Sequence, residues 1–224
     1  MGNCCMKQKR EYKETALLAA QTCFSVSDLE SLYELYKRLS SSIVDDNFIN
    51  QEEFAFGLFG SRKKRNLFAD RQMYHIFDSN HDGLIDFGEF VRSLSIFHPK
   101  APMEDKVSFS FRLYNLGETG YIRLEEVREM VLAFLQESDL VLSDEIVDAI
   151  VVKTFEEADS KGDGKIDMEE WTTFVDRNPA VLKNMTLPYL VDIGTRFPSF
   201  VERKDEDKEM DIFEASFNKI DDTC

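Results

Sequence analysis

The chain contains the segment Asp78-Ser79-Asn80-His81-Asp82-Gly83-Leu84-Ile85-Asp86-Phe87-Gly88-Glu89. Oxygen-bearing side chains stand at its positions 1, 3, 5, 9 and 12, as Asp78, Asn80, Asp82, Asp86 and Glu89. Position 6 is Gly83, and glycine can turn the backbone into the left-handed region without a Cβ clash. Oxygens at this spacing along a tight turn form a ligand set for a hard divalent cation.

The spacing matches the calcium loop of an EF-hand, in which about six to eight oxygens surround Ca²⁺. Glu89 opens the next helix and can offer both carboxylate oxygens, while Leu84 at position 7 offers its backbone carbonyl. We therefore predict a calcium site with all of these ligands: Asp78, Asn80, Asp82, Leu84, Asp86 and Glu89.

The same frame recurs at residues 159–170, with a defect at one position. Its predicted ligands are the side chains of Asp159, Asp163, Asp167 and Glu170, the backbone carbonyl of Lys165, and position 3, which is Lys161. A lysine side chain can only donate, so it removes a ligand and brings a positive charge near the metal. We predict that this fourth hand binds calcium more weakly than the second.

A third loop lies at Asn115–Glu126 and has lost most of its ligands. Asn115 and Glu126 remain, but Glu126 is the sole carboxylate at a ligand position, and Arg123 occupies position 9. We predict a structural hand that binds calcium weakly or not at all.

The first loop, Ser40–Glu53, is two residues longer than usual. Any ion there would depend on backbone carbonyls, on Ser40, and on the carboxylates Asp46 and Glu53. The sequence leaves open whether this loop binds calcium.

The four loops form a repeat, which predicts the fold. Their terminal glutamates, Glu53, Glu89, Glu126 and Glu170, are spaced by 36, 37 and 44 residues, and position 8 is always isoleucine: Ile49, Ile85, Ile122 and Ile166. We predict an all-α protein of four EF-hands in two paired lobes, joined by short loop-to-loop β pairing, with a C-terminal helical tail.

Helices are predicted between the loops from the spacing of apolar residues. The first opens with a capping box at Ser27-x-x-Glu30, and Pro99 and Pro102 mark the lobe boundary. The predicted segments are 1–24 (acylated, basic N-terminal segment and start of the first helix), 25–98 (hands 1 and 2), 99–178 (hands 3 and 4), 179–201 (short helices and a Phe-Pro-Ser-Phe motif) and 202–224 (an acidic tail whose order the sequence leaves open).

Composition excludes several functions. A net charge of −16 argues against nucleic-acid binding. No apolar run approaches the roughly 18 residues of a membrane span. The histidines, His75, His81 and His98, lack metalloprotease spacing, and no nucleophile motif occurs, so we expect no enzymatic activity.

The two ends carry candidate modification sites. Gly2 after Met1 is the acceptor position for N-myristoylation, and Cys4 and Cys5 are placed for palmitoylation beside a basic run. Two lipid signals together make a stable anchor. Ser199 lies between aromatic residues in Phe197-Pro198-Ser199-Phe200 and could accept a phosphate.

Several segments together resemble the calcineurin B-like proteins of plants, over roughly residues 15–201. They are Lys63-Lys64-Arg65-Asn66-Leu67-Phe68-Ala69-Asp70-Arg71, Phe87-Gly88-Glu89-Phe90-Val91-Arg92-Ser93-Leu94, Phe97-His98-Pro99, Asn184-Met185-Thr186-Leu187-Pro188-Tyr189-Leu190 and Phe197-Pro198-Ser199-Phe200. The long first loop also fits that family. Met6, in place of the usual Ser or Thr, and the poor third loop depart from its pattern.

The resemblance implies a calcium sensor that binds and activates a CBL-interacting Ser/Thr protein kinase, whose regulatory helix lies in an apolar groove. It further implies that this kinase phosphorylates Ser199. Acylated members bring the kinase to the cytoplasmic face of a membrane, often the plasma membrane, to regulate ion transport in stress signalling; without acylation a cytosolic pool is expected. Open alternatives are a calcineurin B-type regulatory protein of a phosphatase, a neuronal-type sensor and a passive calcium buffer. The oligomeric state stays open between a monomer and a homodimer.

Overall fold

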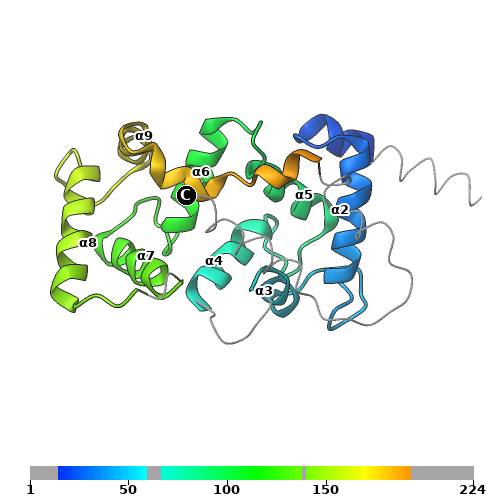
Figure 1. Ribbon diagram of the computed structural model, residues 1–224, viewed down its shortest axis with the longest axis horizontal. Helices are drawn as coiled ribbons and strands as arrows, with labels where there is room; N and C mark the ends of the chain where they lie inside the picture. The colour runs from blue at the N-terminus through cyan, green and yellow to red at the C-terminus, as the bar shows by residue number, and fades with distance from the viewer. Residues whose placement is uncertain (1–14, 60–66, 138–139, 193–224) are drawn as a thin grey trace, which may run out of the picture. The chain divides into compact units, whose positions relative to one another are not determined.

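A computed structural model describes residues 15–59, 67–137 and 140–192, and all of its regular elements are helical. Residues 15–21 are helical. The elements that follow (Figure 1) are α2 (Val26–Leu39), α3 (Gln51–Phe59), α4 (Leu67–Phe77), α5 (Phe87–Ile96), α6 (Met103–Tyr114), α7 (Leu124–Glu137), α8 (Asp144–Ala158), α9 (Met168–Arg177) and the 3-10 helices η2 (Pro179–Met185) and η3 (Pro188–Asp192). The all-α prediction is confirmed.

The loops pair through the isoleucines at position 8, as their repetition predicts. Ile49 and Ile85 exchange two backbone hydrogen bonds, with N···O distances of 3.1 and 3.0 Å. Ile122 and Ile166 do the same at 2.9 and 2.8 Å. All four side chains are buried, so each bridge joins the loops of two paired hands around an apolar centre.

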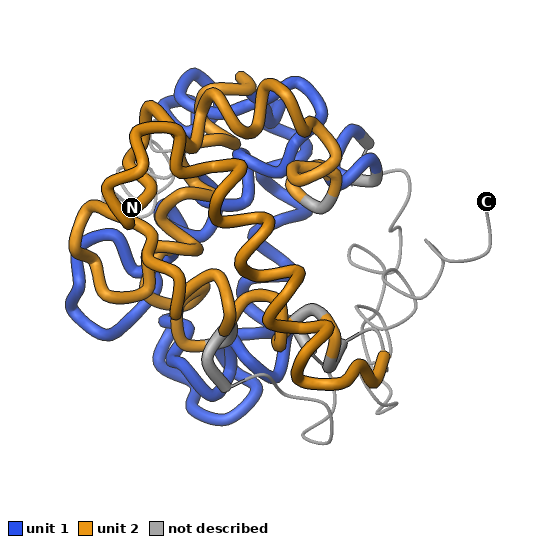
Figure 2. Tube along the Cα trace, turned by 90° about the vertical axis from the view of Figure 1, so that its left-hand side faces the viewer, with its two compact units in different colours: residues 1–62, 77–101, 187–224 blue, residues 63–76, 102–186 orange. Residues whose placement is uncertain are grey.

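The described residues group into two compact units, coloured separately in Figure 2. Unit 1 holds residues 15–59, 77–101 and 187–192, and unit 2 holds residues 67–76 and the described part of 102–186. Hands 3 and 4 lie wholly in unit 2, whereas α4, which leads into the second loop, groups with unit 2 up to Ile76.

An aromatic cluster forms the core of unit 1. The ring centroids of Phe54 and Phe77 lie 4.9 Å apart, and those of Tyr36 and Phe90 lie 5.8 Å apart. All four side chains are buried, and burying a phenylalanine contributes about 1.5–3 kcal/mol to stability. The cluster fixes the helices on which the first two loops are mounted.

Unit 2 is built around the sole tryptophan of the chain. Trp171 on α9 is buried, and its indole N–H donates to the Ser110 hydroxyl of α6 at 3.0 Å. The Tyr114 ring meets it edge-on at a centroid distance of 5.3 Å. The helix that follows the fourth loop is therefore anchored directly behind Glu170.

The predicted capping box at Ser27 and Glu30 is wrong by two residues. The observed N-cap of α2 is Ser25, whose hydroxyl accepts from the Asp28 N–H while the Asp28 carboxylate accepts from the Ser25 N–H. Both pairs fit a three-residue spacing, but Ser25 has the extended backbone that a cap needs (φ −75°, ψ 168°), whereas Ser27 lies inside the helix. Its hydroxyl contacts that of Ser25 at 2.9 Å.

The short helices predicted within residues 179–201 correspond to the 3-10 helices η2 and η3. The Leu187 N–H, between them, donates to the Phe97 carbonyl at 2.8 Å. No helix within the described residues combines the length and the apolar character needed to cross a membrane.

Candidate metal centres

Each of the four loops is closed by its terminal glutamate. One carboxylate oxygen accepts the backbone N–H of position 3 and the other accepts that of position 9. These partners are Val44 and Asn50 for Glu53, Asn80 and Asp86 for Glu89, Gly117 and Arg123 for Glu126, and Lys161 and Asp167 for Glu170, at N···O distances of 2.7–3.1 Å. A carboxylate offers about four lone pairs, so each glutamate keeps acceptor capacity for a cation.

The first loop follows the same frame when its positions are counted back from Glu53. Asn47 then stands at position 6 and has a left-handed backbone (φ +65°), like Gly83 (φ +84°) and Gly164 (φ +79°). The Asp46 carboxylate accepts the Phe48 N–H at 2.9 Å, as a position-5 ligand does in the second hand. The two extra residues are therefore accommodated at the start of the loop.

Sequence reasoning missed the role of Asn47. A signal was available, because asparagine is one of the few non-glycine residues that enter the left-handed region readily. The other predicted residue of this loop, Ser40, is buried and directs its hydroxyl toward the Lys37 carbonyl at 3.4 Å, in the last turn of α2. A metal role for Ser40 stays a prediction.

In the second loop, backbone amides hold the predicted ligands in place. The Asp78 carboxylate accepts the N–H groups of Asp82 and Gly83, at 3.2 and 2.9 Å. Asp86 caps α5 by accepting the Glu89 N–H at 2.8 Å. Asp78 and Glu89 are both buried, so two carboxylates are already withdrawn from water at the two ends of this loop.

The side chains at positions 3 and 5 of the second loop are aligned in the same way. The Asn80 amide oxygen accepts the Asp82 N–H at 2.8 Å. The Asp82 carboxylate accepts the Leu84 N–H at 2.9 Å. The backbone carbonyl of Leu84 stays a predicted ligand.

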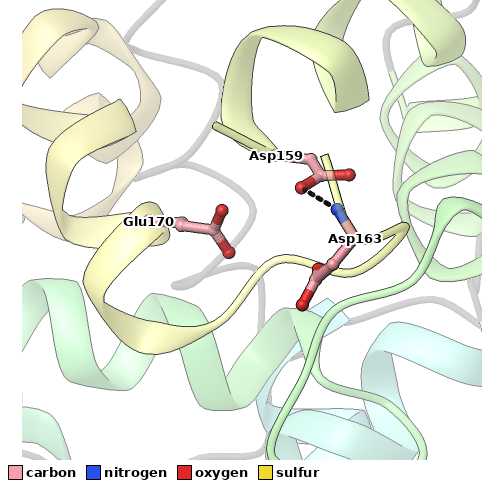
Figure 3. A group of neighbouring side chains, drawn as sticks. All are labelled: Asp159, Asp163 and Glu170. Carbon is pink, nitrogen blue, oxygen red and sulfur yellow. Dashed lines mark hydrogen bonds between the residues drawn. The ribbon is translucent and has the colours of Figure 1, made fainter. Parts of the chain in front are cut away.

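The fourth loop brings three of its predicted ligands together (Figure 3). Glu170 reaches from the first turn of α9 toward the segment that carries Asp159 and Asp163. One carboxylate oxygen from each residue lies within 4.8 Å of the others. Ca²⁺ binds oxygens at about 2.3–2.6 Å, so oxygens on opposite sides of one ion lie up to about 5 Å apart. This donor set fits Ca²⁺.

No other set of three or more acidic side chains in the described part of the chain lies so close together. Asp167, the remaining acidic ligand predicted for the fourth loop, is not in the group. One of its oxygens accepts the Glu170 N–H at 2.9 Å and caps α9, and the other accepts the Lys161 ammonium. The hydrogen bond from Lys161 lowers the pKa of the Asp167 carboxyl and raises the pKa of the ammonium.

The other lysine of this loop, Lys165, lies beside Asp163. Its ammonium is 3.7 Å from an Asp163 carboxylate oxygen and 4.0 Å from the centroid of the Tyr121 ring. That the backbone carbonyl of Lys165 binds the ion remains a prediction.

The third loop is held by its own polar groups. The Thr119 hydroxyl donates to the Tyr121 carbonyl at 3.0 Å, which is the carbonyl of position 7. The Asn115 side chain accepts the Thr119 N–H at 3.1 Å, and Glu118 pairs with His75 of α4. With Glu126 as its sole carboxylate at a ligand position, this donor set fits Ca²⁺ poorly.

Four predicted modification residues, Gly2, Cys4, Cys5 and Ser199, lie outside the described residues.

Comparison with known proteins points to the same loops. An EF-hand family model matches residues 75–95 and 151–175, which contain the second and fourth loops. Calcineurin B-like protein 5 of Arabidopsis thaliana is 50% identical over 203 residues, covering 90% of this chain and 100% of that protein. The type 2 calcineurin B protein of Dictyostelium discoideum is 32% identical over 72% of this chain and 84% of that protein. The calcineurin B protein of Yarrowia lipolytica is 33% identical over 74% of this chain and 90% of that protein.

These likenesses, together with the repeated loops and their paired isoleucines, identify the family and its cofactor, Ca²⁺. The chain belongs to the calcineurin B-like family, and it is a regulatory calcium sensor rather than an enzyme.

Proposed function

We propose that this sensor binds and activates a CBL-interacting Ser/Thr protein kinase when calcium rises. The observation that carries the proposal is the 50% identity to a plant calcineurin B-like protein along that protein's whole length. Identity to the calcineurin B proteins is lower, at 32–33% for the two relatives compared. The Phe197-Pro198-Ser199-Phe200 motif and the long first loop also favour a kinase partner over a phosphatase.

Calcium acts by favouring the conformation that the partner binds. A ligand shifts a conformational equilibrium only by its differential affinity for the two states. EF-hand sensors meet this condition because calcium favours an open helix pair that exposes apolar side chains. The amphipathic regulatory helix of the kinase binds such a surface.

Affinity purification with purified partners tests the proposal. The full chain, in calcium and in chelator, is mixed with a CBL-interacting kinase or with the catalytic chain of calcineurin. We expect calcium-dependent recovery of the kinase and a rise in its activity. Recovery of the phosphatase chain without the kinase would contradict the proposal and favour the calcineurin B-type alternative.

We further propose that acylation of Gly2, with Cys4 and Cys5, anchors the sensor to the cytoplasmic face of a membrane, most often the plasma membrane. One acyl chain binds a membrane marginally and a second makes the attachment stable. Membrane fractionation of Gly2→Ala and of Cys4→Ser/Cys5→Ser variants should show loss of the membrane-bound pool. Retention of the Gly2→Ala protein on membranes would overturn this part of the proposal.

Phosphorylation of Ser199 by the bound kinase completes the proposed cycle, in which ion transport is regulated during stress signalling. A phosphate, with a charge of about −1.5 to −2 at pH 7, added between Phe197 and Phe200 would alter the surface that the partner contacts. Mass spectrometry after incubation with kinase and ATP should find phosphate on Ser199. Ser199→Ala provides the control.

A further inference from the structure

We propose that Lys161 sets the calcium affinity of the fourth loop by acting as a built-in counter-cation for Asp167. The inference rests on calcium binding by the loop and is independent of the partner kinase. It concerns position 3 of the loop. This position normally supplies an oxygen ligand for the ion, and here it supplies a positively charged side chain.

The geometry shows how a lysine can occupy a ligand position without filling the ion site. The backbone N–H of Lys161 donates to the Glu170 carboxylate at 2.8 Å, as position 3 does in the other loops. Its side chain bends back toward the start of α9, where the ammonium pairs with Asp167 and lies 3.2 Å from Glu169. The ammonium therefore binds carboxylates outside the group formed by Asp159, Asp163 and Glu170.

Both carboxylate oxygens of Asp167 are consequently engaged. One caps α9 through the Glu170 N–H, and the other accepts the Lys161 ammonium. In an EF-hand loop, position 9 faces the ion, often through a water molecule. With the lysine attached, the negative charge of Asp167 is neutralised by the protein and contributes little to attracting Ca²⁺.

A comparison of loop charges gives the direction of the effect. The fourth loop contains five acidic residues and two lysines, which gives a net charge of −3. The second loop contains four acidic residues and neither lysine nor arginine, which gives −4. Removing the Lys161 charge makes the fourth loop equal to the second by this count. Because the Lys161 side chain is 45% exposed, solvent and salt screen the effect, and we expect a gain in affinity of about three- to tenfold.

The sole tryptophan provides a direct readout of this site. Trp171 lies in the first turn of α9, directly after Glu170, the closing ligand. Its indole N–H is hydrogen-bonded to Ser110 of α6. Its fluorescence should therefore report calcium binding at the fourth loop selectively. A Glu170→Gln variant, which lacks one of the two ligand oxygens, should abolish this signal and so assign it to the fourth loop.

The experiment is a calcium titration of the full-length protein, followed by tryptophan fluorescence at low and at high salt. Lys161→Met keeps most of the aliphatic stem and removes the charge, so it should bind calcium about three- to tenfold more tightly at low salt, with a smaller gain at high salt. Lys161→Arg should keep the wild-type affinity. Lys153→Met is the matched control, because Lys153 carries the same charge on α8 beside Glu157, outside the loop, and its affinity should not change.

A second pair of variants tests the role of Asp167. Asn is as good a helix cap as Asp, so Asp167→Asn keeps the cap and removes the charge. In that background the gain from Lys161→Met should fall by more than half. An equal gain with and without the Asp167 charge would overturn the assigned partner. The proposal as a whole would be overturned if Lys161→Met showed no gain in calcium affinity. It would also be overturned if the protein gave no calcium-dependent tryptophan signal that Glu170→Gln abolishes.

Discussion

Glu89 and Glu126 make the same two backbone contacts in their loops, yet their neighbours differ. Glu89 closes a loop that contains Asp78 and Asp82 at positions 1 and 5, where the loop of Glu126 has Asn115 and Thr119. The same carboxylate can therefore complete a calcium site in one hand and serve as a structural acceptor in another. The difference lies in the side chains around each glutamate.

Replacing these two glutamates should separate the two roles. Glu89→Gln leaves one ligand oxygen where bidentate binding needs two, so calorimetric titration with calcium should show one ion fewer per chain. Glu126→Gln should leave the number of bound ions unchanged. An unchanged stoichiometry in Glu89→Gln would contradict the assignment of the second loop as a calcium site.

Tyr36 offers a second test at the residue scale. Its buried hydroxyl has one proton to donate and lies 2.7 Å from the Asn47 carbonyl oxygen and 3.0 Å from the Ile85 carbonyl oxygen, so it links the first two loops. Tyr36→Phe removes the hydroxyl from both contacts and should reduce the free energy of unfolding by about 1–2 kcal/mol at about pH 8. Urea unfolding measures this loss, and Tyr33→Phe, at an exposed ring, is the control.

The pH dependence of the same residue has a definite sign. Burial, and then the charges of Asp86 and Asp46, raise the pKa of Tyr36 well above its ordinary value near 10. Above about pH 10 the unfolded chain therefore releases this proton while the folded chain retains it. Stability contributed by Tyr36 is present below about pH 10 and decreases as pH rises further. The Tyr36→Phe protein should lose less stability than the wild type between about pH 9 and 11.

At the scale of elements, the start of α2 gives a matched pair of substitutions. Ser25 accepts the Asp28 N–H as the N-cap, whereas Ser27 has its hydroxyl beside that of Ser25 and lies inside the helix. Ser25→Ala should reduce the free energy of unfolding by about 1 kcal/mol, and Ser27→Ala by much less. Equal losses in thermal or urea unfolding would show that the cap assignment is wrong.

The loops show which parts of the site could be predicted from the sequence. The spacing of ligands and isoleucines predicted the paired hands, because both depend on residue type at a fixed loop position. The course of the Lys161 side chain could not be predicted, because it depends on where α9 places Asp167 and Glu169. For the same reason the sequence ranked the second loop first by ligand type, whereas the closest carboxylate group of the described residues lies in the fourth.

For the whole molecule, the calcium-sensor function makes a prediction about apolar surface. Sensor hands open when they bind calcium, whereas buffer hands change little. An environment-sensitive apolar dye should therefore become more fluorescent when calcium is added to the full chain. Magnesium at the same concentration is the control, and an unchanged dye signal in saturating calcium would favour the passive buffer.

The fold as a whole was predictable to the level of helices and paired loops. The segment boundaries at 25–98 and 99–178 stay a prediction. A proline break predicts where helices stop, but it does not predict with which other helices α4 packs. The units follow packing, which depends on residues far apart in the sequence, such as Phe97 and Leu187. Periodicity along one segment contains no information about such contacts.

The isoleucine bridges have a consequence for hydrogen exchange. In each bridge the two amides bond reciprocally between buried side chains, so one local opening event exposes both to deuterium. Once corrected for their intrinsic exchange rates, the amides of Ile49 and Ile85 should then show one shared free energy of opening, and those of Ile122 and Ile166 another. The protein thus contains one internal reporter of local opening for each pair of hands, readable without a chemical probe attached to the chain.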